Sequence, residues 1–463
     1  MRLIVIGAGS SGLGVALAAA RRGWAVEILE ARDIGGGTTT TSTKLIHGGV
    51  RYLEAAFKRL SYADWRLVRE ALRERAWMLQ SHPRLCHPLS IILPVRHPLE
   101  KWYYGFGLWL YDKLSYPHNI AKTAWVGAKE LSDRFPRLLP GYKGGWRYWD
   151  GQFVDRLYAV HLALFLRQRY GVVIRTHAKV VSVVPRGGEV VVEAALRNGE
   201  RYETKGDYVV NATGPWADEI RNLVQIGVKP RLRLSRGSHL VFPKAHLPIE
   251  EGFLIPRTKD ERLLFVLPWI EGTVLVGTTD EEVEAPTWPA AVSEAETQFL
   301  IEHVKRYFGV SELEIRARFA GYRPLVAQRP NATAKLARTH VVEVWPSQRV
   351  ISLMGGKWTT FRQMGEDAIA AIARLSGRNL APGEPVLSVE PDPSELQRYQ
   401  QGDAQPIVPG LPYTWGEVAF WQSLGWAQDP EDLVAGRWLL PFYDEQKAKQ
   451  VREALQSKWH KLD

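Results

Sequence analysis

The N-terminal stretch contains the pattern that most restricts how this chain can fold. LIVIG, residues 3–7, is a short apolar run typical of a buried parallel strand. It leads directly into Gly7, Gly9 and Gly12, and this GxGxxG spacing opens a predicted helix over residues 11–22. In a dinucleotide-binding fold the first glycine permits a tight turn, the second lets the backbone approach a pyrophosphate, and the third allows the helix to pack closely on the strand.

A second predicted strand completes this unit. AVEILE, residues 25–30, follows Gly23 and ends in Glu30. An acid in this place accepts hydrogen bonds from the ribose hydroxyls of an adenosine, and the N-terminus of the helix faces the phosphates. A lone GxGxxG is weak evidence, but here strand, turn, helix, strand and terminal acid follow in the required order. The unit therefore predicts a Rossmann-like dinucleotide site and leaves FAD and NAD both open.

Length and composition indicate a large soluble or peripheral protein. The 463 residues are 45% hydrophobic and 24% charged, which supports two or three domains. The single Cys86 excludes an intrachain disulfide and a cysteine metal site, and we expect no metal. Residues 1–20 imitate a secretory signal, but the glycine pattern inside them argues against that interpretation. No apolar run approaches the roughly 20 residues that span a bilayer, so we expect a cytoplasmic protein, free or peripheral on the inner face of the cell membrane.

The net charge of +10 favours anionic partners without choosing among small molecules, lipid and nucleic acid. No zinc-finger spacing or helix-turn-helix pattern is present in the sequence, so we expect no nucleic-acid partner. WYYGFGLWLYDKL (residues 102–114) and the basic residues 446–463 are candidates for contact with an anionic membrane surface. Burial of the aromatic segment in a core and solvation of the terminal helix are the alternatives.

Two later stretches favour FAD over NAD. In DYVVNATGPWAD an apolar strand precedes the small-residue turn 212–214, which can pass close to the same cofactor. In LMGGKWTTFRQMGEDAIAAIARL, Gly355 and Gly356 make a turn, and Thr359 or Thr360 is expected to cap the following helix. The N-terminus of that helix would face the edge of a flavin ring where negative charge accumulates on reduction.

A series of motifs then carries a resemblance to one family. The motifs are STKLIHGGVRYLE, NATGPWAD, RGSHLVFPK, VGTTDEE, GYRPLV and GGKWTTFR, in that order along the chain. On these motifs the sequence resembles the FAD-dependent glycerol-3-phosphate dehydrogenases, within the D-amino-acid oxidase-like FAD oxidoreductases, from residue 3 to about 375. The resemblance implies oxidation of sn-glycerol 3-phosphate at C2 to dihydroxyacetone phosphate, with hydride transfer to flavin N5 and electrons passed to a membrane quinone.

The motifs supply candidates for holding the substrate. A phosphate dianion is best bound by planar donors that reach two oxygens at once, and Arg51 and Arg323 are the arginines in these motifs. Tyr52 is predicted to orient the substrate hydroxyls, with a buried packing tyrosine as the alternative. Arg323 is also predicted to take part in the catalytic site.

The same motifs supply candidates for proton transfer. Hydride leaves a secondary alcohol easily only as the hydroxyl proton leaves, so the site needs a general base. His239 and His47 are the candidates, and a hydrogen-bonded structural histidine is the alternative for each. Lys357 is predicted to bind substrate and stabilise its alkoxide or the reduced flavin, with a solvent-facing lysine as the alternative. His239 is also expected to contact the substrate.

The resemblance further predicts where the cofactor lies. The hydroxyl run 38–43 looks like a cradle for the flavin and pyrophosphate, Lys44 and His47 continue along the cofactor, and Val180 touches adenine through its backbone. The predicted cofactor-binding residues are Gly7, Gly9, Ser11, Gly12, Glu30, Ala31, Thr41, Ser42, Thr43, Lys44, His47, Gly48, Val180, Ala212, Thr213, Gly214, Trp216, Gly356, Lys357, Trp358 and Thr359.

We predict an α/β chain, α+β overall, with a Rossmann-like FAD domain and an antiparallel-sheet substrate domain. The family usually carries a longer helical C-terminal domain, and its basic signature survives here only loosely as EDLVAGRWLL, residues 431–440. That departure leaves the oligomeric state open. The predicted parts are residues 1–85, 150–215 and 345–380 for FAD, residues 86–149 and 216–344 for substrate, and a short helical C-terminal region of residues 385–463.

Two other functions stay open at this point. A flavin oxidase that passes electrons to O₂, acting on glycerol 3-phosphate or a related small substrate, would use the same fold. A flavin-binding protein without turnover is the third hypothesis.

Overall fold

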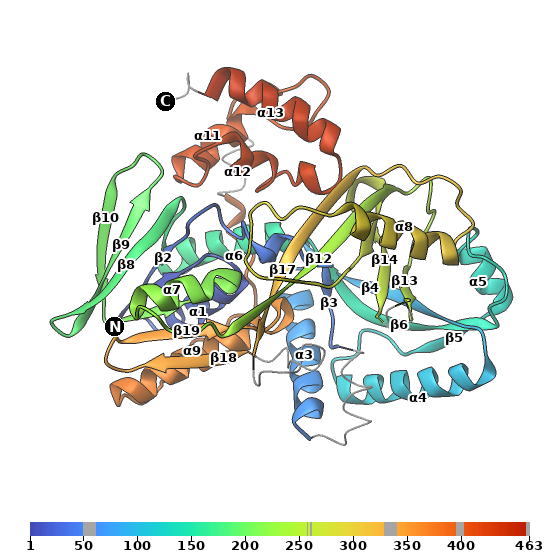
Figure 1. Ribbon diagram of the computed structural model, residues 1–463, viewed down its shortest axis with the longest axis horizontal. Coiled ribbons are helices and arrows are strands. Elements are labelled where there is room, and N and C mark those ends of the chain that lie inside the picture. The colour runs from blue at the N-terminus through green and yellow to red at the C-terminus, as the bar shows by residue number, and fades with distance from the viewer. Residues whose placement is uncertain (50–61, 257, 260–261, 328–339, 395–401, 460–463) are drawn as a thin grey trace.

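The computed structural model describes residues 1–49, 62–256, 258–259, 262–327, 340–394 and 402–459 (Figure 1). A six-stranded sheet and a ten-stranded sheet form the two main layers, and a small three-stranded sheet lies at one end. The mixed α/β architecture confirms the predicted fold class.

The six-stranded sheet contains the predicted dinucleotide unit. Its order is β18-β19-β11-β1-β2-β7, and neighbouring strands are parallel except for β18 and β19. Strand order reverses around β1, and in such sheets ligands bind beyond the carboxyl ends of the strands at that point. Its strands are β1 (Arg2–Ile6), β2 (Ala25–Leu29), β7 (Val173–Arg175), β11 (Tyr208–Asn211), β18 (Val341–Trp345) and β19 (Val350–Met354).

Helix α1 (Ser10–Ala20) connects β1 to β2 and is held unusually close to its neighbours. A Cβ atom at Gly12 would lie 1.9 Å from Gly7 O, and one at Gly14 would lie 2.3 Å from Phe361 O in α9 (Phe361–Ser376). A side chain at either position would therefore push the helix off the sheet or off α9. This packing places the N-terminus of α1 directly above the turn after β1.

The chain also makes an excursion between two parallel strands of the six-stranded sheet. After α6 (Asp155–Tyr170) and β7, the chain forms an antiparallel three-stranded sheet before it returns to β11. These strands are β8 (Ala178–Arg186), β9 (Glu189–Leu196) and β10 (Arg201–Gly206). Helix α7 (Ala217–Val224) then follows β11.

The ten-stranded sheet is antiparallel except where β13 pairs with β4. Its main path is β16-β12-β15-β14-β13-β4-β6-β3, with β17 beside β12 and β5 beside β6. Helices α3 (Tyr62–Ser81), α4 (Pro98–Ser115), α5 (Ala128–Arg134) and α8 (Glu294–Tyr307) pack around it (Figure 1). Its strands are β3 (Leu45–Ile46), β4 (Cys86–Val95), β5 (Ala124–Gly127), β6 (Gly144–Phe153), β12 (Leu232–Pro243), β13 (Gly252–Ile255), β14 (Leu264–Trp269), β15 (Thr273–Gly277), β16 (Glu281–Val283) and β17 (Ala317–Val326).

Two strands cross the domain boundaries expected from the sequence. β3 belongs to the ten-stranded sheet although it precedes residue 85, and most of β18 precedes residue 345 although it belongs to the six-stranded sheet. Short strands at a sheet edge carry little periodicity, so the sequence does not reveal which sheet they join.

The C-terminal region forms a compact helical cap at the top of the view in Figure 1. Its helices are α11 (Trp415–Ser423), α12 (Pro430–Val434) and α13 (Glu445–Trp459), within the region that was predicted to be helical. Buried Trp421, Trp426 and Trp438 belong to the same apolar core as α1 and α6. The cap is thus packed into the same core as the helices of the six-stranded sheet.

Candidate active site

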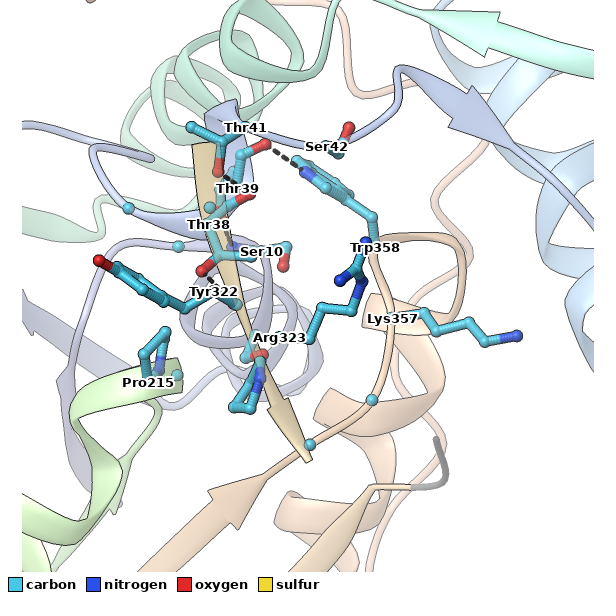
Figure 2. A pocket seen from close by; sticks show the side chains of 18 of the residues that line it. Ser10, Thr38, Thr39, Thr41, Ser42, Pro215, Tyr322, Arg323, Lys357 and Trp358 are labelled. Atoms are coloured by element: carbon cyan, nitrogen blue, oxygen red, sulfur yellow. Dashed lines mark hydrogen bonds between the residues drawn. The ribbon is translucent and has the colours of Figure 1, made fainter. Parts of the chain in front are cut away.

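One elongated cavity of about 840 Å³ lies between the two large sheets. Its volume is in the upper part of the range of about 300–1,000 Å³ common for small-molecule and cofactor sites. It begins at the carboxyl ends of β1, β2 and β11 and reaches side chains of β12 and β17 in the other sheet. Figure 2 shows residues from both layers facing the same space.

The end of the cavity near β2 is built around Glu30. Its Oε2 accepts a hydrogen bond from Ala8 N–H at 2.6 Å, and its Oε1 accepts one from Arg32 N–H at 2.9 Å. Burial raises the pKa of Glu30, and the two backbone hydrogen bonds oppose that shift. Arg32 then turns over the Trp216 ring, with Cζ 4.2 Å from the ring centroid. The acid therefore joins the β1 turn to the loop that follows β2.

The hydroxyl run lines one wall of the cavity and ties several segments together. Thr38 Oγ1 donates to Tyr322 O at 2.7 Å, and Thr39 Oγ1 accepts from Ser10 N–H at 3.0 Å. Trp358 Nε1 donates to Thr39 O at 2.9 Å (Figure 2). The small hydroxyl side chains thus connect the start of α1, strand β17 and the turn before α9 without filling the cavity.

Lys44 does not line the cavity, contrary to the expectation that it continues along the cofactor. Its buried Nζ donates to both carboxylate oxygens of Asp155, at 2.8 and 2.9 Å, and to Thr40 O at 2.5 Å. Burial lowers the pKa of Lys44, and the charge of Asp155 opposes that shift. Because the ammonium group already has an anionic partner, its role is to fix the hydroxyl loop to α6.

Gly12 and Gly48 also lie outside the cavity lining. Gly12 serves the packing of α1 on β1, and a Cβ atom at Gly48 would lie 2.3 Å from Leu72 Cδ2. Thr360 occupies the N-cap position of α9, but its side chain makes no cap hydrogen bond and instead donates to Lys357 O at 3.4 Å. The prediction that a threonine side chain caps α9 is therefore wrong.

His239, on β12, is a buried cavity-lining imidazole. Its ring stacks on Phe319 with a centroid distance of 4.9 Å, and its Nε2 lies 3.0 Å from Thr43 Oγ1. Nδ1 has no hydrogen-bond partner within the described residues. Burial lowers the pKa of His239 well below its ordinary value, and the positive charges of Lys44 and Arg323 lower it further. The ring is therefore neutral at neutral pH and able to accept a proton.

Arg323, on β17, is fixed at the same end of the cavity. Nη2 donates to Thr278 Oγ1 and to Thr279 O, both at 3.1 Å. Nη1 donates to Ser235 Oγ at 3.3 Å and to Asp280 Oδ1 at 3.4 Å. These bonds orient the planar guanidinium, which is the arrangement that suits recognition of an anionic oxygen group.

His47 and Lys357 line the cavity as well. Figure 2 shows Lys357 extending away from the hydroxyl residues Thr38 and Thr39. Arg51 and Tyr52 lie outside the described residues, so their roles stay predictions. The predicted site residues that line the cavity are Gly7, Gly9, Ser11, Glu30, Ala31, Thr41, Ser42, Thr43, His47, Val180, Ala212, Thr213, Gly214, Trp216, His239, Arg323, Gly356, Lys357, Trp358 and Thr359.

Several cavity residues were not expected from the sequence. Thr278, Thr279 and Asp280 fall within the motif VGTTDEE, but nothing in that motif marks them as partners of Arg323. Arg262 also lines the cavity and donates through Nη1 to Asp280 O at 2.8 Å, and no motif contains it. These residues meet only because β14, β15 and β17 lie in one sheet.

A buried polar network supports the His47 side of the cavity. Gly48 N–H donates to Tyr111 OH at 2.9 Å, and Tyr111 OH donates to Asp150 Oδ1 at 2.7 Å. Arg75 Nη1 donates to the same oxygen at 2.7 Å. Burial raises the pKa of Asp150, and the charge of Arg75 opposes that shift. Asp150 itself lines the cavity, so the network joins the cavity wall to α3 and α4.

Comparison with known proteins shows which family the chain belongs to. The model of the FAD dependent oxidoreductase family matches residues 2–362. A probable mitochondrial glycerol-3-phosphate dehydrogenase of Dictyostelium discoideum is 33% identical over 508 residues, covering 96% of this chain and 78% of the relative. The chain belongs to the FAD-dependent glycerol-3-phosphate dehydrogenase family.

Other members of the family are longer than this chain. The mitochondrial glycerol-3-phosphate dehydrogenase of Arabidopsis thaliana is 37% identical over 383 residues, which cover 80% of this chain and 60% of the relative. The mitochondrial enzyme of Rattus norvegicus is 36% identical over 403 residues, covering 83% of this chain and 54% of the relative. The matched part is thus little more than half the length of these two relatives.

Solved structures agree on the fold. The glycerol-3-phosphate dehydrogenase of Bacillus halodurans, complexed with FAD, has a TM-score of 0.72 at 22% identity and covers 98% of this chain and 89% of its own. The L-α-glycerophosphate oxidase of Mycoplasma pneumoniae, with FAD bound, has a TM-score of 0.63 at 16% identity and covers 84% of this chain and 97% of its own.

The described residues fit FAD, the cofactor of this family. A Cβ atom at Gly9 would lie 3.0 Å from Thr39 Oγ1, so the glycine keeps the phosphate-side passage open. The N-terminus of α1 opens onto the cavity beside Gly9, and Glu30 stands where the dinucleotide fold places the adenosine ribose. The turns at Ala212 and Gly356 line the same cavity further along.

Proposed function

We propose that this chain oxidises sn-glycerol 3-phosphate at C2 to dihydroxyacetone phosphate, using FAD, and passes the electrons to a membrane quinone. The observation that supports this most is the pairing of a neutral buried His239 with a fixed Arg323 at one end of a cofactor-sized cavity. The names of the related proteins point to the same substrate.

His239 is the proposed general base. When bound, FAD supplies the acceptor for the hydride that leaves C2 with two electrons. The proton of the C2 hydroxyl goes to the unprotonated ring nitrogen of His239, which lines the cavity. A neutral imidazole is needed because a protonated ring could not accept that proton.

Arg323 is the proposed phosphate ligand. Four hydrogen bonds hold the guanidinium plane in place before substrate binds, one to Ser235 on β12 and three to residues 278–280. Such preorganisation reduces the conformational entropy that binding costs. Arg262 lies in the same cavity and adds a second positive charge, while Arg51 and Tyr52 keep the roles proposed from their motif.

Helix α4 provides the proposed contact with the membrane where a quinone would be found. Leu99, Trp102, Phe106 and Trp109 form an exposed apolar stripe along it, with exposed fractions of 82%, 78%, 50% and 52%. Burial of the aromatic segment in a core was the alternative given by the sequence, and these three aromatic side chains are exposed. Lysines on the same helix and the net charge of +10 complement an anionic lipid surface.

The second membrane candidate from the sequence is less suitable. Ala448, Val451, Leu455 and Trp459 form the apolar face of α13, and all four are buried against the rest of the chain. That face is therefore not available to lipid. Among the described helices, none has the length and apolar character that crossing a membrane requires.

Anaerobic mixing of the yellow FAD-loaded protein with glycerol 3-phosphate tests the substrate. Loss of the flavin absorbance near about 450 nm is expected, and unphosphorylated glycerol should cause far less. Absence of bleaching would refute the proposed activity and favour a flavin protein without this turnover. Reoxidation faster with a quinone analogue than with O₂ is expected, and the reverse order would favour the oxidase.

Liposome co-sedimentation tests the membrane contact. The protein should bind vesicles that contain anionic lipid, and Trp102→Ser together with Trp109→Ser should weaken binding while leaving flavin reduction unchanged. Leu387, an equally exposed apolar residue outside α4, provides the control Leu387→Ser. Equal binding of the α4 variant and the wild type would show that α4 does not contact lipid.

A further inference from the structure

The segment EDLVAGRWLL of the C-terminal cap makes contacts that the proposed reaction does not use. Its Arg437 is buried and reaches Asp33, in the loop that follows β2. Arg437 Nη1 donates to Asp33 Oδ2 at 2.7 Å, and Nη2 donates to Asp33 Oδ1 at 3.0 Å. Arg156, from α6, donates through Nη2 to the same Oδ2 at 2.5 Å. One buried carboxylate is thus shared by two arginines from different parts of the chain.

This ion pair fits tightly against the loop. A Cβ atom at Gly436 would lie 2.4 Å from Asp33 Oδ2, so the backbone of the cap itself touches the carboxylate. Burial favours protonation of Asp33, but the charges of Arg437 and Arg156 outweigh it and keep the pKa of this carboxyl below its ordinary value. Asp33 is therefore ionised; Arg437 binds both of its oxygens, and Arg156 binds Oδ2.

A second contact joins the same two regions. His177 Nε2 lies 3.0 and 2.9 Å from the two carboxylate oxygens of Asp432, which is also in the segment EDLVAGRWLL. His177 N–H donates to Arg32 O at 2.9 Å, and the next residue, Ala178, donates through its N–H to Glu30 O at 2.8 Å. The cap therefore holds the strand that is hydrogen-bonded to Glu30 and Arg32.

Both contacts hold segments that border the cavity. Glu30 and Arg32 line the cavity, and Asp33 precedes Gly36 and Gly37, which line it as well. Gly36 N–H donates to Asp33 O at 2.9 Å, so movement of Asp33 would move this loop. None of the described residues of the cap lines the cavity, so these two contacts would act on the cofactor through Asp33 and His177.

We propose that the C-terminal cap retains FAD, with Arg437 and Asp432 as positioning residues that hold the loop of residues 30–37 around the adenosine half of the cofactor. The inference rests on FAD binding in this cavity and is independent of which substrate is oxidised. It gives the C-terminal region a role that its loose resemblance to the family signature did not provide.

A metal site is the other interpretation of these residues. His177, Asp429 and Asp432 lie close enough together to ligate an ion. However, Asp432 Oδ2 already accepts from the backbone N–H groups of Gln428 and Asp429, and Asp429 pairs with Arg197. The carboxylates are thus used in protein hydrogen bonds and ion pairs, which favours the positioning role.

The test compares FAD retention in Arg437→Met with the wild-type protein. This change leaves Asp33 paired with Arg156 and keeps an unbranched side chain beside Trp421 while removing the guanidinium. FAD should dissociate from the variant at least about tenfold faster on dilution, measured by recovery of flavin fluorescence. Once saturated with FAD, the variant should be reduced by substrate at the wild-type rate. Arg452→Met is the matched control, because Arg452 lies in the same cap and pairs with the exposed Glu431, away from Asp33.

Equal FAD dissociation rates in Arg437→Met and the wild type would overturn the proposal. Should Arg437→Met fail to fold, Arg437→Lys keeps the charge and removes the two-oxygen contact, and it should show the same direction of change. A variant whose melting temperature falls equally with and without FAD, at an unchanged dissociation constant, would show a purely structural role and also overturn it. A wild-type protein that does not bind FAD would refute the cofactor and this proposal, whereas FAD binding without reduction by glycerol 3-phosphate would refute only the proposed reaction.

Discussion

Replacement of Arg323 by alanine removes the proposed phosphate ligand without disturbing the cofactor side of the cavity. A charge-assisted hydrogen bond contributes about 1.5–3 kcal/mol, so a guanidinium that binds two phosphate oxygens contributes about 3–6 kcal/mol. Arg323 is partly exposed, with a side-chain exposure of 22%, and solvent screening favours the lower half of that range. At about 1.4 kcal/mol for each factor of ten, kcat/KM for glycerol 3-phosphate should fall roughly 10²–10³-fold.

Steady-state kinetics and flavin absorbance measure the two effects separately. KM should rise strongly, whereas the flavin content of the purified protein should match the wild type. Arg323→Lys should restore only part of the loss, because a lysine keeps the charge but cannot bind two oxygens in one plane. Arg233→Ala is the control, since Arg233 lies on β12 and pairs with the exposed Glu282. An unchanged KM in Arg323→Ala would remove Arg323 from the substrate site.

The same variant should change the pH profile. Burial lowers the pKa of His239 most, and the charges of Lys44 and Arg323 lower it further. Loss of the Arg323 charge should therefore raise this pKa, and the acid limb of kcat/KM should move to higher pH. An acid limb that stays in place would show that His239 is not the titrating base.

Three further predictions concern other parts of the site. His239→Asn should slow anaerobic flavin reduction by about 10²–10⁴-fold at unchanged FAD content, and a rate within a few-fold of wild type would exclude His239 as the base. Tyr111→Phe leaves Gly48 N–H without its acceptor and Asp150 without one donor. The free energy of unfolding of the FAD-saturated protein, measured with urea, should therefore fall by about 1–3 kcal/mol. An unchanged free energy of unfolding would contradict the network. Burial opposes protonation of His177, but the hydrogen bond and charge of Asp432 raise its pKa above 6.5 overall. The stability that this pair contributes should therefore be present below pH 6.5 and be lost as pH rises through the higher folded-state pKa. Asp432→Asn should abolish that dependence on pH.

The dinucleotide unit could be predicted from sequence because its signals are local. The apolar run before Gly7, the glycine spacing and Glu30 all fall within one short stretch, and each has a physical role in the turn that the structure shows. His239 and Arg323 could be found because they stand inside recognisable motifs. They meet in one cavity because β12 pairs with β17. That strand pairing could not be predicted from the sequence.

Other features depend on contacts between distant parts of the chain. Lys44 was expected at the cofactor, but its partner Asp155 is 111 residues away and α6 places it against the loop. Arg437 meets Asp33 across 404 residues, and neither residue carries a local signal for the other. The exposure of Trp102 and Trp109 on α4 also depends on which face of that helix the sheet covers. Such pairings are set by tertiary packing, which overrides local pattern.

Anaerobic single-turnover reduction with glycerol 3-phosphate, in ordinary form and with deuterium at C2, tests the proposed hydride removal from C2. Both forms should bleach the flavin, the deuterated form more slowly, because the C2–H bond is broken as the hydride leaves. His239→Asn should show no comparable bleaching on the same time scale. A flavin that stays oxidised in the wild-type protein at saturating glycerol 3-phosphate would contradict the proposed reaction.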